Sequence, residues 1–369
     1  MLKTNFLGLE LDNPIIIAAG PWNRDGEGLR RSIASGAGAV VTESIVSDTL
    51  LDVRPRIACD GNGAQNIRLY SDVQIEGWER ELSIAKSGGG VVIASISAHT
   101  PSELVYLASK LEKFGADAIE ISVSNPAGEG LEVVASHANV VYEMTKEVVN
   151  AVKLPVMVKL SQNTTNISKV AKAVKTAGGS CVSAINSVRG ILGVDIETAV
   201  PTLSTYGGIS GEYIRPLGLS SVATISQTVD IPICGIGGIS SGKHAIEYMM
   251  MGASAVQIGT AVMLEGREIV GKIVEEMADW CKAHSLDAIQ EIRGKALKNL
   301  KSFDEMKIEP AVSTVKSVPC TENCDKCTVA CMYGAIKREN NTVVADGDKC
   351  SGCGLCTFIC PAGKLKLEW

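Results

Sequence analysis

Residues 233–260 read ICGIGGISSGKHAIEYMMMGASAVQIGT, and they show the pattern from which the fold can be predicted. A short apolar run ends in glycines, a longer stretch with helical periodicity follows, and a second apolar run again ends in glycine. Runs that are apolar on both faces are typical of parallel strands covered by helices. The stretch therefore predicts two parallel strands joined by a helix.

The same strand and helix unit recurs through about the first 300 residues of the 369-residue chain. Eight apolar runs end in small or polar residues, namely Pro14 to Ala19, Ala39 to Ser44, Val91 to Ser97, Ala118 to Ser124, Val156 to Ser161, Cys181 to Ser187, Ile233 to Gly238 and Ala255 to Thr260. Eight such units match a closed (β/α)8 TIM barrel better than an open doubly wound sheet. Before the first run, LGLELDNP at 7–14 is expected to form a small hairpin that plugs the lower end of the barrel.

The composition indicates a globular protein that acts on small molecules or on other proteins. The chain is 46% hydrophobic and 21% charged, its net charge is −6, and no run of Lys or Arg stands out. These values argue against nucleic acid or an anionic membrane as the main partner. The first twenty residues lack the apolar core of a signal peptide, and no stretch approaches the ~18 apolar residues of a membrane helix, so we expect a soluble cytoplasmic protein.

Small and polar residues gather where the predicted strands end, which is where barrel enzymes carry their active sites. These residues are Gly20, Glu43, Ser44, His99, Ser124, Asn125, Lys159, Asn186, Ser187, Gly237, Gly238, Gly259 and Thr260. Such residues also end strands that have no catalytic role. Lys159 is harder to explain in that way, because a lysine that closes the apolar run LPVMVKL is costly without an anionic partner.

Two glycine clusters, GIGGI at 235–239 and QIGTA at 257–261, follow the seventh and eighth predicted strands. Barrels commonly bind a phosphate with backbone N–H groups at this position, and glycine lets the backbone approach the ligand closely. The pair therefore indicates a phosphate-bearing ligand. The alternative is that the glycines only allow strands and helices to pack tightly.

The last fifty residues contain eight of the twelve cysteines. The run Cys350, Cys353, Cys356, Cys360 and Pro361 has the C-x2-C-x2-C-x3-C-P spacing of bacterial ferredoxins, in which the fourth cysteine ligates the other cluster. The run Cys320, Cys324, Cys327 and Cys331 departs from this spacing, with three residues between its first two cysteines and Met332 in place of proline.

The two runs together predict two [4Fe-4S] clusters with shared ligation. One would be held by Cys320, Cys324, Cys327 and Cys360, and the other by Cys331, Cys350, Cys353 and Cys356. Zinc is disfavoured because a zinc module needs only four ligands, and disulfides are not expected in a chain without a signal peptide. The C-x3-C spacing leaves the completeness of the first cluster open. The predicted domains are a barrel over 1–304, a linker over 305–317 and a small ferredoxin-like α+β domain with both clusters over 318–369.

Taken together, the motifs resemble a known family. They are LGLELDNPIIIAAG at 7–20, RPRI at 54–57, NIRLYSD at 66–72, GADAIEISVSNP at 115–126, VKLSQN at 158–163, INSV at 185–188, YGGISGEYIRP at 206–216, GIGGI and QIGTA. The barrel resembles the FMN-dependent dihydroorotate dehydrogenases. Barrel and cysteine-rich module together resemble the pyrimidine-reducing half of dihydropyrimidine dehydrogenase, including its bacterial iron-sulfur subunit.

The resemblance implies a role for each residue that matches the family motifs. Ala19 and Gly20 would face the flavin ring, Ser44 would reach the flavin, and Lys159 would lie against its N1 and O2 side, where a cation stabilises reduced flavin. The phosphate would be held by Gly211, Gly237, Gly238, Gly259 and Thr260. The amide edges of a pyrimidine would be bound by Asn66, Asn186 and Ser187, with Asn125 beside them.

Two departures from the family pattern bear on the substrate. Asn125 stands where the family has an acid/base cysteine, and an amide cannot transfer a proton near neutral pH. Glu43 replaces a lysine, which is expected to reverse the charge beside flavin and substrate. Both changes disfavour dihydroorotate, which is a carboxylate. Glu43 or His99 could replace the missing acid, and Glu129 and His137 are weaker candidates.

The sequence therefore predicts an iron-sulfur flavoprotein that moves hydride between FMN and a small cyclic substrate with an activated C=C bond, and exchanges electrons through [4Fe-4S] clusters. No GxGxxG motif follows an early strand, so an FAD- and NAD(P)-binding subunit or a soluble ferredoxin is the expected electron partner. The family also suggests a homo-oligomer. The alternatives are a non-catalytic electron-transfer or scaffold subunit, a catalytically idle relative, and a flavin-free barrel enzyme that acts on a phosphorylated substrate.

Overall fold

The computed structural model of the chain describes residues 1–48, 53–68, 70–126, 134–306, 311–316, 320, 324–339 and 342–368. Glu129 and part of the predicted linker lie outside these residues. The chain divides into two compact units, Met1–Asn299 and Leu300–Trp369. Among the described helices, none is long and apolar enough to cross a membrane.

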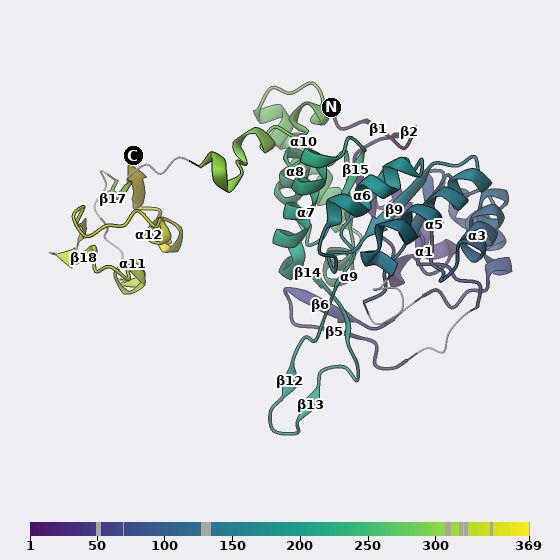
Figure 1. Cartoon of the computed structure of the whole chain (residues 1–369), viewed down its shortest axis with the longest axis horizontal. Helices are drawn as coiled ribbons and strands as arrows, with labels where there is room; N and C mark the ends of the chain where they lie inside the picture. Colours follow the sequence, from purple (N-terminus) through teal and green to yellow (C-terminus); the bar gives the residue numbers. More distant parts are fainter. Residues whose placement is uncertain are drawn as a thin grey trace. The chain divides into compact units, whose positions relative to one another are not determined.

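The first unit is built on a closed barrel of eight parallel strands (Figure 1), which confirms the predicted TIM barrel. In their order around the barrel the strands are β3 (Ile15–Ile17), β4 (Ala39–Val41), β7 (Val91–Ile96), β8 (Ala118–Ser122), β9 (Val156–Leu160), β10 (Cys181–Ala184), β15 (Ile233–Ile236) and β16 (Ala255–Ile258). Each predicted apolar run contains one of them.

Helices cover the outside of the barrel, as the helical stretches between the apolar runs predict. They are α1 (Gly26–Ala34), α2 (Trp78–Lys86), α3 (Pro101–Lys113), α5 (Ala138–Ala151), α6 (Ile167–Thr176), α7 (Arg215–Thr228), α8 (Gly242–Met250), α9 (Thr260–Glu265) and α10 (Ile269–Ala283). Short 3-10 turns lie at Pro21–Asn23, Ile75–Gly77, Glu212–Ile214, Ile289–Ile292 and Leu297–Asn299.

Alternation along each strand separates an outer core from an inner one, since successive side chains point to opposite faces of the sheet. Ile15 and Ile17 pack outward among the helices, whereas Ile16 points into the barrel. The hairpin β1 (Thr4–Phe6) and β2 (Leu9–Leu11) adds Phe6 and Leu11 to the inner core. A hairpin does close one end of the barrel, but it spans 4–11 rather than the predicted 7–14, so the predicted stretch supplies only its turn and its second strand.

A small antiparallel sheet lies at the opposite end of the barrel from β1 and β2 (Figure 1), and the strand and helix pattern does not predict it. Its strands, in order, are β11 (Val188–Gly190), β14 (Gly207–Gly211), β6 (Gly63–Asn66) and β5 (Ile57–Cys59). A further hairpin, β12 (Val194–Asp195) with β13 (Val200–Pro201), projects from this end. The sheet pairs Asn66 with Gly208, so two segments that are far apart in the sequence meet at this end of the barrel.

The second unit is an α+β structure with a small core. Two antiparallel pairs join β17 (Val312–Val315) to β20 (Leu365–Glu368) and β18 (Ile336–Glu339) to β19 (Thr342–Ala345). The helices are α11 (Lys326–Ala330) and α12 (Leu355–Ile359), with a 3-10 turn at Phe303–Glu305. Its core consists of Cys320, Cys327, Ile336, Val343, Cys356 and Leu365. Half of these core residues are cysteines, which leaves little ordinary apolar packing.

Candidate functional site

Two cavities lie side by side where the barrel strands end. The larger, of about 180 Å³, is lined at one end by Gly211, Gly237, Gly238 and Gly259, and we call it the glycine cavity. The smaller, of about 130 Å³, is lined by three asparagines and is called the amide cavity. Both share a wall made of Ala19, Gly20, Pro21, Asn66, Lys159, Asn186, Ser187 and Gly208. A ligand in one cavity would therefore contact a ligand in the other across these residues.

All residues predicted for cofactor or substrate line one or both cavities. Those on the glycine cavity are Ala19, Gly20, Asn66, Lys159, Asn186, Ser187, Gly211, Gly237, Gly238, Gly259 and Thr260. The amide cavity adds Glu43, Ser44 and Asn125. His99 and His137 are exposed and line neither cavity. The histidines are therefore poorly placed to act on a ligand here.

Glycine is needed at two positions in the wall of the larger cavity, because neighbouring backbone atoms lie where a Cβ would be. Gly211 has a φ of +86°, and a Cβ there would lie 2.6 Å from the Gly63 Cα. Gly238 has a φ of +66°, and a Cβ there would lie 2.7 Å from the Gly211 carbonyl oxygen. Nearby, the Thr260 hydroxyl donates to the Ser210 hydroxyl at 2.8 Å. The result is a part of the cavity lined by closely packed glycine backbone, which suits a phosphate group.

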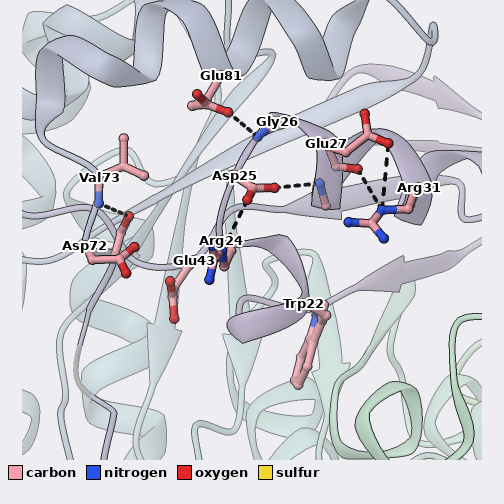
Figure 2. Close-up of polar contacts among 12 residues, drawn as sticks. Trp22, Arg24, Asp25, Gly26, Glu27, Arg31, Glu43, Asp72, Val73 and Glu81 are labelled. Atoms are coloured by element: carbon pink, nitrogen blue, oxygen red, sulfur yellow. Dashed lines mark hydrogen bonds and ion pairs between the residues drawn. The ribbon is translucent and has the colours of Figure 1, made fainter. Parts of the chain in front are cut away.

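The loop after β3 is fixed by polar contacts at the start of α1 (Figure 2). Asp25 accepts a hydrogen bond from the Gly28 N–H at 2.8 Å, and Glu81 accepts one from the Gly26 N–H at 2.7 Å. The Trp22 indole N–H donates to the Ala18 carbonyl at 2.8 Å, and its ring lies where a Cβ on Gly20 would be. These contacts hold Ala19 and Gly20 in the shared wall and leave room only for small residues there.

Lys159 has the anionic partner that its position in an apolar strand requires. Its Nζ lies 3.6 Å from Oε1 of Glu120, whose side chain is fully buried inside the barrel. The other carboxylate oxygen of Glu120 accepts from the Ser183 hydroxyl at 2.9 Å and from the Gln257 amide at 2.7 Å. Glu120 and Gln257 were not among the predicted site residues. Each is a polar residue within an apolar run, Glu120 in AIEIS at 118–122 and Gln257 in AVQIG at 255–259. The same feature drew attention to Lys159, so the sequence does carry a signal for both residues.

The expectation that Glu43 presents an uncompensated negative charge is wrong. Arg68 donates to both carboxylate oxygens of Glu43, at 2.5 and 2.8 Å, and both side chains are almost fully buried. Arg68 also lies 3.3 Å from Asp72. Burial raises the pKa of Glu43 above its usual range, against the opposing effect of Arg68. The sequence gives no signal for the pairing, because Glu43 follows β4 and Arg68 follows β6.

Hydrogen bonds fix the polar walls of the amide cavity. The Asn186 amide donates to the Ser124 carbonyl at 3.1 Å and to its hydroxyl at 2.8 Å. Asn66 accepts from the Arg68 N–H at 2.8 Å, and the Ser44 and Ser95 hydroxyls lie 3.0 Å apart. Asn66, Asn125 and Asn186 thus present carboxamides, which recognise the donors and acceptors of an amide edge.

Residues 1–280 match the family model for dihydroorotate dehydrogenase. The chain belongs to the dihydroorotate dehydrogenase family. It is similar to the "Dihydroorotate dehydrogenase B (NAD(+)), catalytic subunit" of Methanocaldococcus jannaschii, at 36% identity over 303 residues, and of Pyrococcus horikoshii, at 37% over 311. The alignments cover 80% and 81% of this chain and 98% of each relative. As a member of the dihydroorotate dehydrogenase family, the chain is an oxidoreductase that acts on CH–CH groups.

Membership in this family implies FMN, and the glycine cavity fits that cofactor. The glycine end suits the phosphate, and Lys159 is the cation on the shared wall. Within the described structure, the buried Oε1 of Gln257 has no hydrogen-bond partner although Gln257 lines this cavity. An unpaired acceptor at that depth suits an N–H donor on a bound ring.

The second unit lies outside the residues matched by the dihydroorotate dehydrogenase model, and its cysteines line two small cavities. One is lined by Cys320, Cys324, Cys327 and Cys360, and the other by Cys331, Cys350, Cys353 and Cys356. These are the two sets that the predicted ligation requires. In the described residues no three His, Cys, Asp or Glu side chains are close enough to share one metal ion. The thiols of each set surround a cavity, which is the arrangement that the four separate irons of a [4Fe-4S] cluster need.

Several cysteine sulfurs accept hydrogen bonds. The Ser313 N–H donates to the sulfur of Cys350 at 3.2 Å, and the Ser313 hydroxyl lies 3.1 Å from the sulfur of Cys356. Cys331 accepts from the Ala335 N–H at 3.3 Å. Burial acts to raise the pKa of Cys331, but the backbone N–H groups after it lower the pKa overall. These donors favour the thiolate at Cys331, which is the form that binds iron, whereas burial raises the pKa of Cys327 in the other set.

Proposed function

We propose that this member of the dihydroorotate dehydrogenase family is an iron-sulfur flavoprotein. It moves hydride between FMN in the glycine cavity and a small, neutral, cyclic substrate with an activated C=C bond in the amide cavity. The observation that carries the proposal is the wall that the two cavities share, with Lys159 in it. Electrons pass through two [4Fe-4S] clusters to an FAD- and NAD(P)-binding subunit or a soluble ferredoxin. The relatives are named as catalytic subunits of an NAD(+) enzyme, which supports a partner subunit.

The charges around the amide cavity favour a neutral substrate. Glu43 is paired with Arg68, and Lys159 with Glu120. The other described residues that line this cavity are uncharged. A substrate that carries a net charge would therefore lose its water without gaining an unpaired opposite charge. A lactam or cyclic imide matches the carboxamides and hydroxyls that remain.

The chain's own residues divide the work of the reaction. FMN, when bound, supplies the group that accepts or donates hydride. Ala19 and Gly20 are small enough to let ring and substrate lie face to face, and Lys159 supplies positive charge beside the ring. Asn66, Asn125, Asn186 and Ser187 orient the substrate through its amide edges.

Glu43 is the proposed proton donor in place of the family's cysteine, because it lines the amide cavity and burial raises its pKa. Both of its oxygens accept from Arg68 in the structure, so Glu43 must first take up a proton and turn one oxygen from Arg68 toward the substrate, which leaves Arg68 paired with Asp72. The group must be protonated to act, so the rate of substrate reduction should fall as pH rises through this raised pKa. Glu43→Gln should lower kcat by roughly 10²–10⁴-fold, the usual contribution of general acid catalysis. The measurement is kcat against pH for both proteins.

Asp72→Asn is the matched control for Glu43→Gln, since Asp72 contacts the same Arg68 but does not line the cavity. It should retain the rate at low pH, and the fall in rate should begin at a somewhat lower pH, because the charge of Asp72 contributes to the raised pKa of Glu43. A Glu43→Gln protein with an unaltered pH profile would exclude Glu43 as the donor.

Lys159→Ala is expected to lower the reduction potential of the bound flavin and to slow substrate reduction, because the cation beside the ring is lost. The change also leaves Glu120 buried without its partner, which should cost about 3–5 kcal/mol of unfolding free energy. Potentiometric titration followed by flavin absorption, and thermal unfolding, measure the two effects. Lys159→Arg keeps the charge and is the control. An unchanged potential with normal flavin binding would refute the placement of Lys159.

The proposed function is tested on protein purified without oxygen. Flavin and cluster bands in the absorption spectrum, release of FMN on denaturation and turnover of uracil-like heterocycles with a reductant would support it. The panel of test substrates should include orotate and neutral lactams. If the flavin and cluster bands are present but no substrate is turned over, the protein is an electron-transfer subunit instead. Absence of flavin from the purified protein, together with no binding of added FMN, would overturn it.

A further inference from the structure

Glu120 is a buried carboxylate that lines neither cavity yet contacts two residues that do, Lys159 and Gln257. We propose that Glu120 is a positioning residue that fixes both groups against the bound flavin and lowers the flavin's reduction potential. The proposal rests on FMN binding in the glycine cavity.

The two oxygens of Glu120 have different partners, which fixes the direction of the carboxylate. Oε2 accepts from Ser183 on β10 and from Gln257 on β16. Oε1 accepts no hydrogen bond in the described structure and lies 3.6 Å from the Lys159 ammonium. Glu120 stands on β8, Lys159 on β9, Ser183 on β10 and Gln257 on β16, so this one side chain links four strands of the barrel.

This arrangement also fixes which end of the Gln257 amide faces the glycine cavity. A carboxylate can only accept, so the amide nitrogen must point to Glu120. The amide oxygen is then left as the unpaired buried acceptor. Glu120 therefore determines that Gln257 offers an acceptor, and not a donor, to a ring in this cavity.

The charge of Glu120 acts against that of Lys159. Both side chains are shielded from water, with exposures of 0% and 7%, so their fields are weakly screened. A cation beside the flavin favours its reduced state, and an anion disfavours it. Glu120 thus holds the ammonium in place while offsetting part of its effect. The pair sets a flavin potential below the one that Lys159 alone would give.

The test is a potentiometric titration of the holoprotein, wild type against Glu120→Gln. The change removes one negative charge at nearly constant shape. The flavin potential is expected to rise by about 30 mV or more, which for two electrons is at least tenfold in the reduced-to-oxidised equilibrium. The ratio of the dissociation constants for oxidised and reduced FMN should change by the same factor, and this readout does not depend on turnover.

Asp117→Asn is the matched control, because Asp117 directly precedes β8, pairs with Lys86 and accepts from the Val92 N–H at the start of β7, and lines neither cavity. It should lower thermal stability and leave the flavin potential unchanged. If Glu120→Gln does not fold, Glu120→Asp withdraws the carboxylate from Lys159 while keeping its charge, and should give a smaller rise. A potential that falls or stays constant in the Glu120 variant overturns the proposal. If the wild-type protein does not bind FMN, the proposed function itself is wrong, and this is seen before any variant is made.

Discussion

Cys353→Ala is expected to remove one iron-sulfur cluster and leave the other. Iron should fall from ~8 to ~4 per chain, since each [4Fe-4S] cluster carries four irons. Cys353 belongs to the cavity lined by Cys331, Cys350 and Cys356, so the opposite cavity keeps its full set of thiols. Reduction of an external electron acceptor by substrate should be lost, because the proposed route to the partner runs through both clusters. Iron analysis and electron paramagnetic resonance of the reduced protein measure the loss.

Cys324→Ala is the companion variant and should cost the other cluster. The structure brings Cys324 to the same cavity as Cys327 and Cys360 in spite of the three residues that separate it from Cys320. Cys59→Ala is the control, since Cys59 is exposed and lines neither cysteine cavity. A wild-type protein with ~4 Fe and no response to Cys324→Ala would mean that the C-x3-C spacing has broken the first site.

Dihydroorotate should be a very poor substrate of the wild-type protein, although the relatives carry its name. Asn125 lines the amide cavity where a base is needed, and an amide cannot take the proton. Repulsion by Glu43 contributes less than a bare charge would. Two unscreened like charges ~4 Å apart at an effective dielectric of ~20 repel by roughly 4 kcal/mol, and the bonds from Arg68 offset most of this. The missing base is therefore the larger obstacle.

Asn125→Cys is expected to raise the rate of dihydroorotate oxidation by at least ~100-fold, the lower end of what a positioned base contributes. Asn125→Ala is the control that alters shape without supplying a base. Glu43→Lys alone would place two cations together in a buried site, so the charge must be changed as a pair, Glu43→Lys with Arg68→Glu. Rapid oxidation of dihydroorotate by the unmodified protein would show that the role assigned to Asn125 is wrong.

The barrel could be predicted from the sequence because strands buried on both faces leave continuous apolar runs. The run VMVKL became β9, with Lys159 at the cavity wall. The sheet of β5, β6, β11 and β14 left no such trace, because strands such as Gly63–Asn66 are short and pair with a segment some 140 residues away. Of the residues that this sheet contributes to the site, Asn66 and Gly211 were predicted only through the family resemblance, and Gly208 was not predicted.

The partners of the site residues could not be predicted in the same way. That Lys159 needs an anion follows from elementary electrostatics, but the choice of Glu120 depends on which side chains of β8 and β9 point into the barrel together. The Arg68 and Glu43 pair depends on how a loop folds over the end of a strand. Charge reversal at Glu43 was therefore expected wrongly, since sequence alone does not reveal a compensating charge on another segment.

In the second unit, Cys331 lines the cavity of the second cysteine run and Cys360 lines that of the first run. This arrangement affects how the unit folds and how its clusters are inserted. Each cavity is lined by three cysteines of one run and by the last cysteine of the other run. Neither run alone therefore supplies the four thiols that one cluster needs. Under the proposed ligation, cofactor insertion cannot be finished on one half while the other is still unfolded. Maturation and folding of the unit then become a single event.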